Sequence, residues 1–323
     1  MVQYFPADMK VFIEPFLGGG SVSLSVADDT RFTKLERMIA GDLYTEMWAF
    51  WNGVKKDPAA VEEIATKWFT EKCPTHKDVI LTKLDASTVK RIMQNPEQID
   101  TDLSAKLEIY NQATSEAQEF WNWTQTVNTE EMSLEERAAR MLLVNKISFS
   151  AMGDSGSLSK DQFCGFRLDK LNRVYATSKL LQRIEIYNVS FEETMKYAEQ
   201  YNPEEVFIFL DPPYFNQESS GLYGKGGNTH KGFPHQFFAD TTLNCKANWF
   251  VTYDDSVAVR QLFNKSMWNG QRPYFKDFKT IYTMAGKTAE DALAGEELFI
   301  SNMNIVGDDA VDGYVENDES MDF

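Results

Sequence analysis

Short apolar runs that end abruptly in glycine, proline or acidic residues set the pattern of this 323-residue chain. The first run, Val11 to Ile13, predicts a buried strand, and Gly18 to Gly20 predict a tight turn after it. Ser21 to Val26 then predicts the first turns of a helix, with Ser21 near its N-cap. This order predicts a β-turn-α unit.

A second run, Met38 to Ala40, predicts a strand that ends at Gly41 and Asp42. The residues after it place apolar side chains at helical spacing between 43 and 51. Asp42 is therefore predicted at a strand tip. Its distance from the glycine turn resembles the spacing at which a carboxylate meets ribose hydroxyls in nucleotide-binding βαβ folds.

The run from Val206 to Leu210 predicts the strand that delivers Asp211-Pro212-Pro213-Tyr214. Ligands of open α/β sheets bind outside the carboxyl ends of the strands. The glycine turn at Gly18 to Gly20 and the Asp-Pro-Pro-Tyr segment are therefore both predicted to face a ligand. Further strands are predicted at residues 184–187, 249–252, 279–282 and 298–301, and a helix at 168–181.

The residues between the second predicted strand, which ends at Ala40, and the third, which begins at Ile184, are mostly charged and helix-favouring, with few strand signals. They predict helices at 104–123 and 134–146, followed at 147–160 by a hairpin or loop. We therefore expect a sheet domain in two parts, 1–52 and 165–306, interrupted by a helical insert at 53–164. Residues 307–323 carry acidic side chains and no basic one, which predicts a disordered tail.

The net charge of −17 argues against a nucleic-acid partner, although screening lets a local basic cluster bind DNA on an acidic protein. No apolar run approaches the roughly 18 residues of a membrane helix, and no secretory signal is visible. The sequence thus predicts a cytoplasmic protein without a membrane partner. Cys73, Cys164 and Cys245 are scattered, which favours free thiols over a disulfide framework or zinc site.

The Asp-Pro-Pro-Tyr segment suits methyl transfer to an aromatic amine, whose lone pair is delocalised into its ring. Asp211 and the backbone carbonyl after it can accept hydrogen bonds from the two amine protons. Pro212 and Pro213 fix the backbone and hold that carbonyl in one direction, and Tyr214 offers a flat face to an extruded base. This chemistry needs no metal. A Pro-Pro turn with a capping Asp is the structural alternative for the segment taken alone.

In these motifs the chain resembles a Dam-type DNA adenine-N6 methyltransferase, and its phage branch in particular. The resemblance is carried by the Glu-Pro-Phe-x-Gly-Gly-Gly turn, Asp-Pro-Pro-Tyr, Tyr4-Phe5-Pro6 and the closing strand 295–302, and it covers most of residues 4 to 302. It implies a Rossmann-like S-adenosylmethionine-dependent methyltransferase sheet and transfer of a methyl group from S-adenosylmethionine to adenine N6 in DNA.

The resemblance also implies roles for individual residues. Catalysis would fall to Asp211, Pro212, Pro213 and Tyr214. The cofactor would be bound by Glu14, Pro15, Phe16, Gly18, Gly20, Asp42 and Asp211. The insert would be the target-recognition domain for double-stranded DNA, with predicted DNA contacts at Phe149, Ser150 and Lys160. Apart from the resemblance, the Gly-rich stretch after Asp-Pro-Pro-Tyr predicts further DNA contacts at Lys225 and Lys231, against the alternative of an ordinary exposed loop. The stretch after Phe149 differs from that of relatives that read GATC, so the target sequence stays undetermined.

One departure from the family pattern concerns the start of the chain. Relatives carry a Gly-Gly-Lys-like segment ahead of Tyr4-Phe5-Pro6, and this sequence begins at Met1-Val2-Gln3. Three explanations are open: the true start of the gene lies upstream, a second chain supplies the segment as a further partner, or activity is impaired. Two alternatives remain open: a catalytically impaired protein that binds DNA or a partner, and an amino methyltransferase acting on RNA or protein.

Overall fold

The computed structural model describes residues 1–148, 156–215, 232–282 and 293–305, and these form two compact units. A sheet unit contains Met1–Leu43 and the described residues from Arg183 onward, and a helical unit contains Tyr44–Gln182. The helical unit thus begins earlier and ends later than the insert predicted at 53–164. Within the described ranges, no helix has both the length and the apolar character needed to cross a bilayer.

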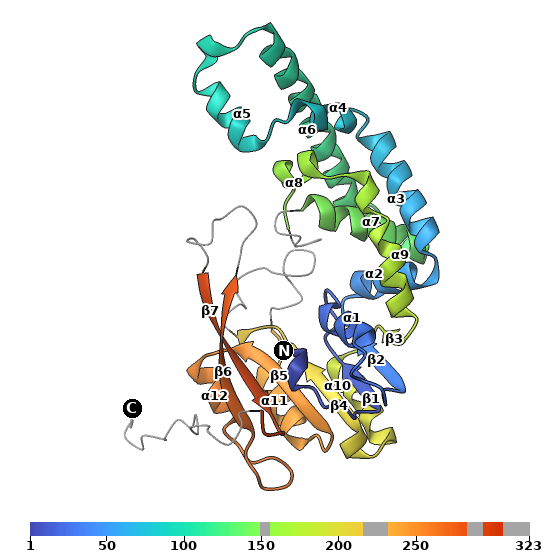
Figure 1. Cartoon of the computed structure of the whole chain (residues 1–323), viewed down its shortest axis with the longest axis vertical. Coiled ribbons are helices and arrows are strands. Elements are labelled where there is room, and N and C mark those ends of the chain that lie inside the picture. The colour runs from blue at the N-terminus through green and yellow to red at the C-terminus, as the bar shows by residue number, and fades with distance from the viewer. Residues whose placement is uncertain (149–155, 216–231, 283–292, 306–323) are drawn as a thin grey trace. The chain divides into compact units, whose positions relative to one another are not determined.

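The sheet unit is built on seven strands in the order β3-β2-β1-β4-β5-β7-β6 (Figure 1). Their bounds are β1 Val11–Glu14, β2 Arg37–Gly41, β3 Ile184–Tyr187, β4 Val206–Leu210, β5 Asn248–Asp254, β6 Tyr274–Tyr282 and β7 Leu293–Ser301. The first five strands of this order pair in parallel, whereas β7 runs antiparallel to both β5 and β6. The predicted Rossmann-like α/β fold is confirmed.

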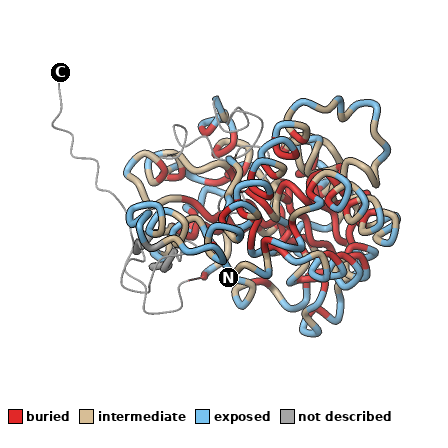
Figure 2. The backbone as a smooth tube through the Cα atoms, turned by 90° about the horizontal axis from the view of Figure 1, so that it is seen from above, coloured by how far each residue is buried: buried red, intermediate tan, exposed pale blue. Residues whose placement is uncertain are grey.

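One face of the sheet packs against helices in a largely aliphatic core. The helices of the sheet unit are α1 Ser21–Asp28, α10 Phe191–Met195, α11 His235–Asn244 and α12 Val257–Phe263. Ile13, Ile208 and Val251 belong to one buried cluster with Phe191, from α10, and Phe238, from α11. All residues of β4 are buried, as expected of a parallel strand covered on both faces. Buried residues are red in Figure 2.

The other face of the sheet is aromatic. Phe5, from the segment before β1, lies 4.5 Å from Phe207 and 5.6 Å from Phe209 between ring centroids. Phe250 and Phe299 continue the row across β5 and β7, with their centroids 5.1 Å apart. Each fully buried ring contributes about 1.5–3 kcal/mol by leaving water, so this row anchors the start of the chain onto the sheet.

The helical unit is an array of α-helices, several of which begin at a side-chain cap. Their bounds are α2 Thr45–Lys56, α3 Pro58–Lys72, α4 His76–Thr82, α5 Ala86–Met93, α6 Thr101–Thr126, α7 Leu134–Ile147, α8 Lys160–Gly165 and α9 Arg173–Leu181. Asp57, Asp85 and Asp100 accept a hydrogen bond from a backbone N–H in the first turn of α3, α5 and α6. Ser133 and Glu136 form a capping box at α7.

Helices α2 and α7 pack closely because a glycine lies at their contact. A Cβ atom built on Gly53 would come within 2.4 Å of the carbonyl oxygen of Leu134 and 2.6 Å of Ala138 Cβ. An ion pair joins the same helices, since Arg137 Nη2 lies 2.7 Å from Glu46 Oε1 with both side chains mostly buried. Close backbone approach and charge pairing therefore act together here.

The structure refines or corrects several local predictions. Ser21 is the first residue of α1, next to its N-cap as predicted, and the N-cap itself is Gly20, whose φ of 67 suits glycine. Leu43 lies outside α2 and is 67% exposed. The helix predicted at 168–181 is a 3-10 turn, Leu168–Lys170, followed by α9. In the stretch 147–160, residues 149–155 lie outside the described residues, and Ser148 and Leu158 form an antiparallel bridge.

We expect Gly53→Ala to destabilise the protein by about 1–3 kcal/mol, because the added methyl group overpacks the α2–α7 contact. Gly165→Ala is the matched control, since a Cβ there would meet nothing within 4 Å. Urea unfolding followed by circular dichroism gives both free energies of unfolding. Equal stability of the two variants would contradict this account of the contact.

Candidate functional site

Three carboxylates lie at the carboxyl ends of three adjacent parallel strands. Glu14 is the last residue of β1, Asp42 follows β2, and Asp211 follows β4. Strand β1 lies between the other two, with Ile13 paired to both Ile39 and Ile208. The parallel register therefore brings residues far apart in sequence to one edge of the sheet. Asp211 and Asp42 both raise the pKa of Glu14 by charge repulsion.

The glycine turn between β1 and α1 is tied to the end of β2. Gly18 and Gly20 have φ values of 46 and 67, in the left-handed region that favours glycine. The backbone N–H of Gly18 donates to Asp42 Oδ2 at 2.8 Å, and that of Leu17 donates to the carbonyl oxygen of Gly41 at 2.9 Å. A Cβ on Gly18 would meet nothing within 4 Å, so the turn leaves open space above its backbone.

Glu14 lies beneath this turn and is 2% exposed. Its Oε2 accepts a hydrogen bond from the backbone N–H of Ser23 at 2.9 Å and a second one from the Ser23 hydroxyl. Burial raises the pKa of Glu14 to about 8, although the bonds from Ser23 oppose the rise. Glu14 therefore joins β1 to the first turn of α1 as a carboxyl that is largely protonated at neutral pH.

Asp211 is solvent-accessible but closely surrounded by protein. Its Oδ1 accepts a hydrogen bond of 2.6 Å from the hydroxyl of Thr252 on β5. Desolvation raises the pKa of Asp211 to about 6, while hydrogen bonds from Thr252 and Tyr214 oppose the rise. The group is thus mainly a carboxylate at neutral pH and remains open to a ligand.

The segment after Asp211 is fixed by its neighbours. Pro212 is buried, while Pro213 and Tyr214 are half-buried. The ring of Tyr214 lies 6.0 Å from that of Tyr253, tilted by 32°. One residue further on, the backbone N–H of Phe215 donates to Asp254 Oδ1 at 2.7 Å. Strand β5 therefore holds the segment at both of its ends.

An aromatic group lies beside the glycine turn. Half-buried Phe16 is stacked on Phe191 at 5.6 Å with an interplanar angle of 21°. Phe233 and Phe238 contact Phe16 edge to face at 5.8 and 5.7 Å. Pro15, which is buried, connects Phe16 to Glu14. The turn is therefore bounded by an apolar surface on this side and by carboxylates on the other.

The sheet unit contains all of the residues predicted for catalysis and cofactor binding, and they cluster at the ends of β1, β2 and β4. Lys160, a predicted DNA contact, is the exposed first residue of α8 in the helical unit. Phe149, Ser150, Lys225 and Lys231 lie outside the described residues, as does the acidic tail. The assigned roles remain predictions.

Sequence reasoning missed the residues that hold the carboxylates in place. Thr252 and Asp254 contact the Asp211 segment, and Ser23 contacts Glu14. The sequence did contain a signal for Thr252 and Asp254. Polar residues follow the apolar run 249–251, which is the same pattern that identified Asp42 and Asp211. Nothing in the local sequence distinguishes Ser23 from the neighbouring serines of α1.

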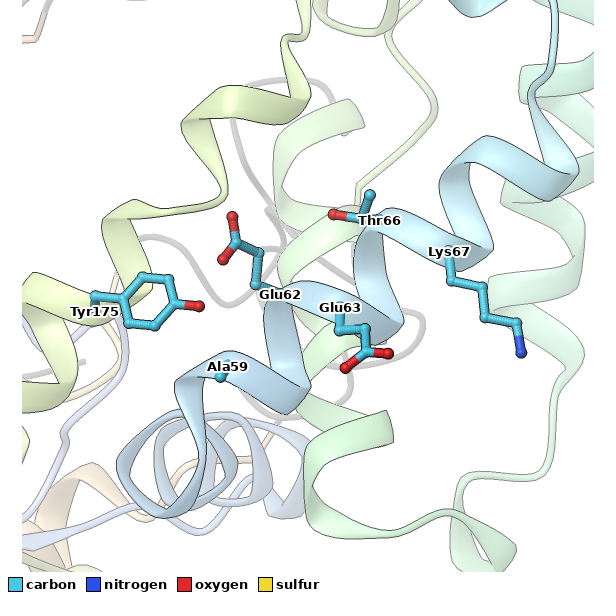
Figure 3. Close-up of a pocket in the computed structure, with 6 residues that line it drawn as sticks. All are labelled: Ala59, Glu62, Glu63, Thr66, Lys67 and Tyr175. Atoms are coloured by element: carbon cyan, nitrogen blue, oxygen red, sulfur yellow. The ribbon is translucent and has the colours of Figure 1, made fainter.

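A shallow depression on the helical unit is lined by residues of α3 together with Tyr175 of α9 (Figure 3). The Tyr175 hydroxyl points toward Glu62 and hydrogen-bonds with it. The lining of the depression includes the carboxylates of Glu62 and Glu63 and the ammonium group of Lys67. None of the residues predicted for catalysis, cofactor binding or DNA contact lines this depression.

A family model described as D12 class N6 adenine-specific DNA methyltransferase matches residues 1–281, which include the glycine turn, the three carboxylates and the helical unit. Comparison with curated proteins gives no match.

We expect Glu14→Gln to flatten the decline in stability with rising pH. The folded pKa of Glu14 is about 8, above its ordinary value of 4.5, so the unfolded chain ionises first. The wild-type free energy of unfolding then loses up to about 1.4 kcal/mol per pH unit between these two values and none from this group outside them. Glutamine reproduces the protonated carboxyl and does not titrate.

The measurement is urea unfolding of both proteins from pH 4 to pH 9. Groups common to both proteins cancel in the difference between their stabilities, which isolates Glu14. A difference that stays constant across this range would show that Glu14 is ionised in the folded protein.

Proposed function

Since this chain belongs to the family of D12 class N6 adenine-specific DNA methyltransferases, we propose that it transfers a methyl group from S-adenosylmethionine to N6 of adenine in DNA. The observation that carries the proposal is the convergence of the glycine turn, Asp42 and Asp211 at adjacent strand ends. In an open α/β sheet this edge is where a cofactor and a substrate can meet.

The residues at this edge fit the proposed cofactor. The turn at Gly18 is open where a side chain would project, so an elongated ligand can lie against its backbone. Asp42 presents a half-buried carboxylate, which can accept hydrogen bonds from ribose hydroxyls. The acidic character of the edge suits a cationic sulfonium. S-adenosylmethionine would supply an electrophilic methyl group there and leave as a thioether.

Asp211 and the residues after it would hold the target amine. As a carboxylate, Asp211 accepts a hydrogen bond from one N6 proton, and the backbone carbonyl of Pro212 accepts one from the other. Both bonds favour a more tetrahedral nitrogen, whose lone pair would attack the methyl carbon as the bond from that carbon to sulfur breaks, and the surplus N6 proton would then pass to solvent. Tyr214 offers its ring to stack against the base once the base has left the helical stack. Pro212 and Pro213 limit the motion of this segment.

The helical unit would recognise the DNA target. Its exposed Lys160 at the start of α8 can contact phosphate, which supports this assignment. Phe149 and Ser150, which follow α7 in the sequence, would approach bases of the DNA. Lys225 and Lys231, which follow Tyr214, would contact the phosphate backbone of the DNA.

We expect Asp211→Asn and Tyr214→Ala to abolish methylation while leaving the fold intact. The first variant removes the charged acceptor for the amine, and the second removes the stacking surface. Asp28→Asn, at the far end of α1, is the matched control and should keep full activity. Transfer of labelled methyl groups to DNA measures activity, and circular dichroism checks folding. Normal turnover by either variant would remove that residue from the mechanism.

We expect Asp42→Asn to weaken binding of S-adenosylmethionine by about 10- to 100-fold, the loss of one hydrogen bond to a charged group. Asparagine keeps one oxygen for the Gly18 N–H and replaces the other oxygen with an amide NH2 donor. Isothermal titration calorimetry of the wild type, this variant and Asp28→Asn gives the affinities. Equal affinity of all three would place the ribose away from Asp42.

A further inference from the structure

Thr252 donates a short hydrogen bond to Asp211. Its Oγ1 lies 2.6 Å from Asp211 Oδ1 and 3.5 Å from the carbonyl oxygen of Leu210. The shorter distance makes Asp211 the acceptor, because hydroxyl donors prefer separations of about 2.7–2.8 Å. Thr252 is 1% exposed, so solvent does not compete for its hydroxyl.

Thr252 is also held firmly itself. Strand β5 pairs with β4 on one side and with β7 on the other, and Thr252 is directly opposite Phe299 on β7. As a β-branched residue in a buried strand, threonine is restricted in χ1, so its hydroxyl direction is set by the sheet. Asp254, two residues on and therefore on the same face of β5, accepts the bond from Phe215 N–H.

The charged and titratable groups around Asp211 come from several elements. Glu297 on β7 and Glu14 on β1 are acidic neighbours, and both are coupled to Asp211 by charge repulsion. Tyr214 donates a hydrogen bond to Asp211 from its own segment. Asp254 of β5 is nearby but is engaged by Phe215. Desolvation and Glu297 thus favour the protonated form of Asp211, and the hydroxyl donors favour the carboxylate.

We infer that Thr252 is a positioning residue for methyl transfer: its hydroxyl holds Oδ1 of Asp211, stabilises the carboxylate and leaves Oδ2 directed to the target amine. The inference rests on the proposed function, because it assigns Asp211 to the amine. Thr252 itself is buried and acts through Asp211 rather than on the substrate.

The test compares Thr252→Val, which keeps the shape and removes the hydroxyl, with Thr252→Ser, which keeps the hydroxyl. Thr242→Val is the matched control, since Thr242 is also buried but donates to the carbonyl oxygen of Phe238 within α11. The pH dependence of kcat and KM for DNA methylation is measured for each protein. Thr252→Ala, which also lacks the hydroxyl, provides the same comparison if the valine variant does not fold.

In the wild type we expect activity to fall as the pH drops through about 6, where Asp211 becomes protonated. In Thr252→Val this fall in activity, the acidic limb of the pH profile, should move up by about one to two pH units. Loss of the hydrogen bond to the Asp211 carboxylate favours the protonated form of Asp211. Above the limb, kcat should be reduced while KM for the cofactor is unchanged. Thr252→Ser and Thr242→Val should retain the wild-type limb.

A second readout does not depend on activity. The carboxyl carbon resonance of Asp211, assigned by its loss in Asp211→Asn, reports the titration of this group without DNA. The same upward shift in Thr252→Val supports the inference. Wild-type protein that does not methylate DNA overturns the proposed function, and with it the inference. An active wild type with unchanged limb and titration in Thr252→Val overturns the inference alone.

Discussion

The site depends on parallel pairing of β2, β1 and β4, which forces three acidic side chains together. Parallel strands end on the same edge, so Glu14, Asp42 and Asp211 cannot avoid one another. Each is stabilised by a neutral donor: Glu14 by Ser23, Asp42 by the Gly18 N–H, and Asp211 by Thr252. Hydrogen bonding to neutral groups stabilises a carboxylate without cancelling its charge. The edge therefore remains acidic and available to a cationic ligand.

Differences in burial then give these carboxyl groups different protonation states. Glu14 is enclosed and largely protonated at neutral pH, so it acts as part of the framework between β1 and α1. Asp211 keeps contact with solvent and is mainly ionised, which suits a group that must accept a hydrogen bond from a ligand. In the proposed function the same residue chemistry would thus serve structure at one strand end and binding at the next.

The strands that carry the site could be predicted because each ends in residues with special backbone or charge properties. Residues 184–187 and 206–210 match β3 and β4 in full. The start of β6 at Tyr274 was missed because Lys276 and Asp277 interrupt its apolar pattern, and pairing with β7 decides its length. The contact of Thr252 with Asp211 was not predictable, since it depends on the register between two strands.

The position of β7 has a consequence for how the protein is made. Among the described strands, β7 is synthesised after the others yet lies between β5 and β6, so one edge of β5 stays unpaired until residues 293–301 have left the ribosome. Thr252 and Asp254 become fixed in a covered strand only at that stage. A nascent chain therefore holds its glycine turn and Asp-Pro-Pro-Tyr segment long before the surroundings of Asp211 are complete. Catalytic competence would be acquired late in synthesis, and truncated products would expose a strand edge to chaperones and proteases.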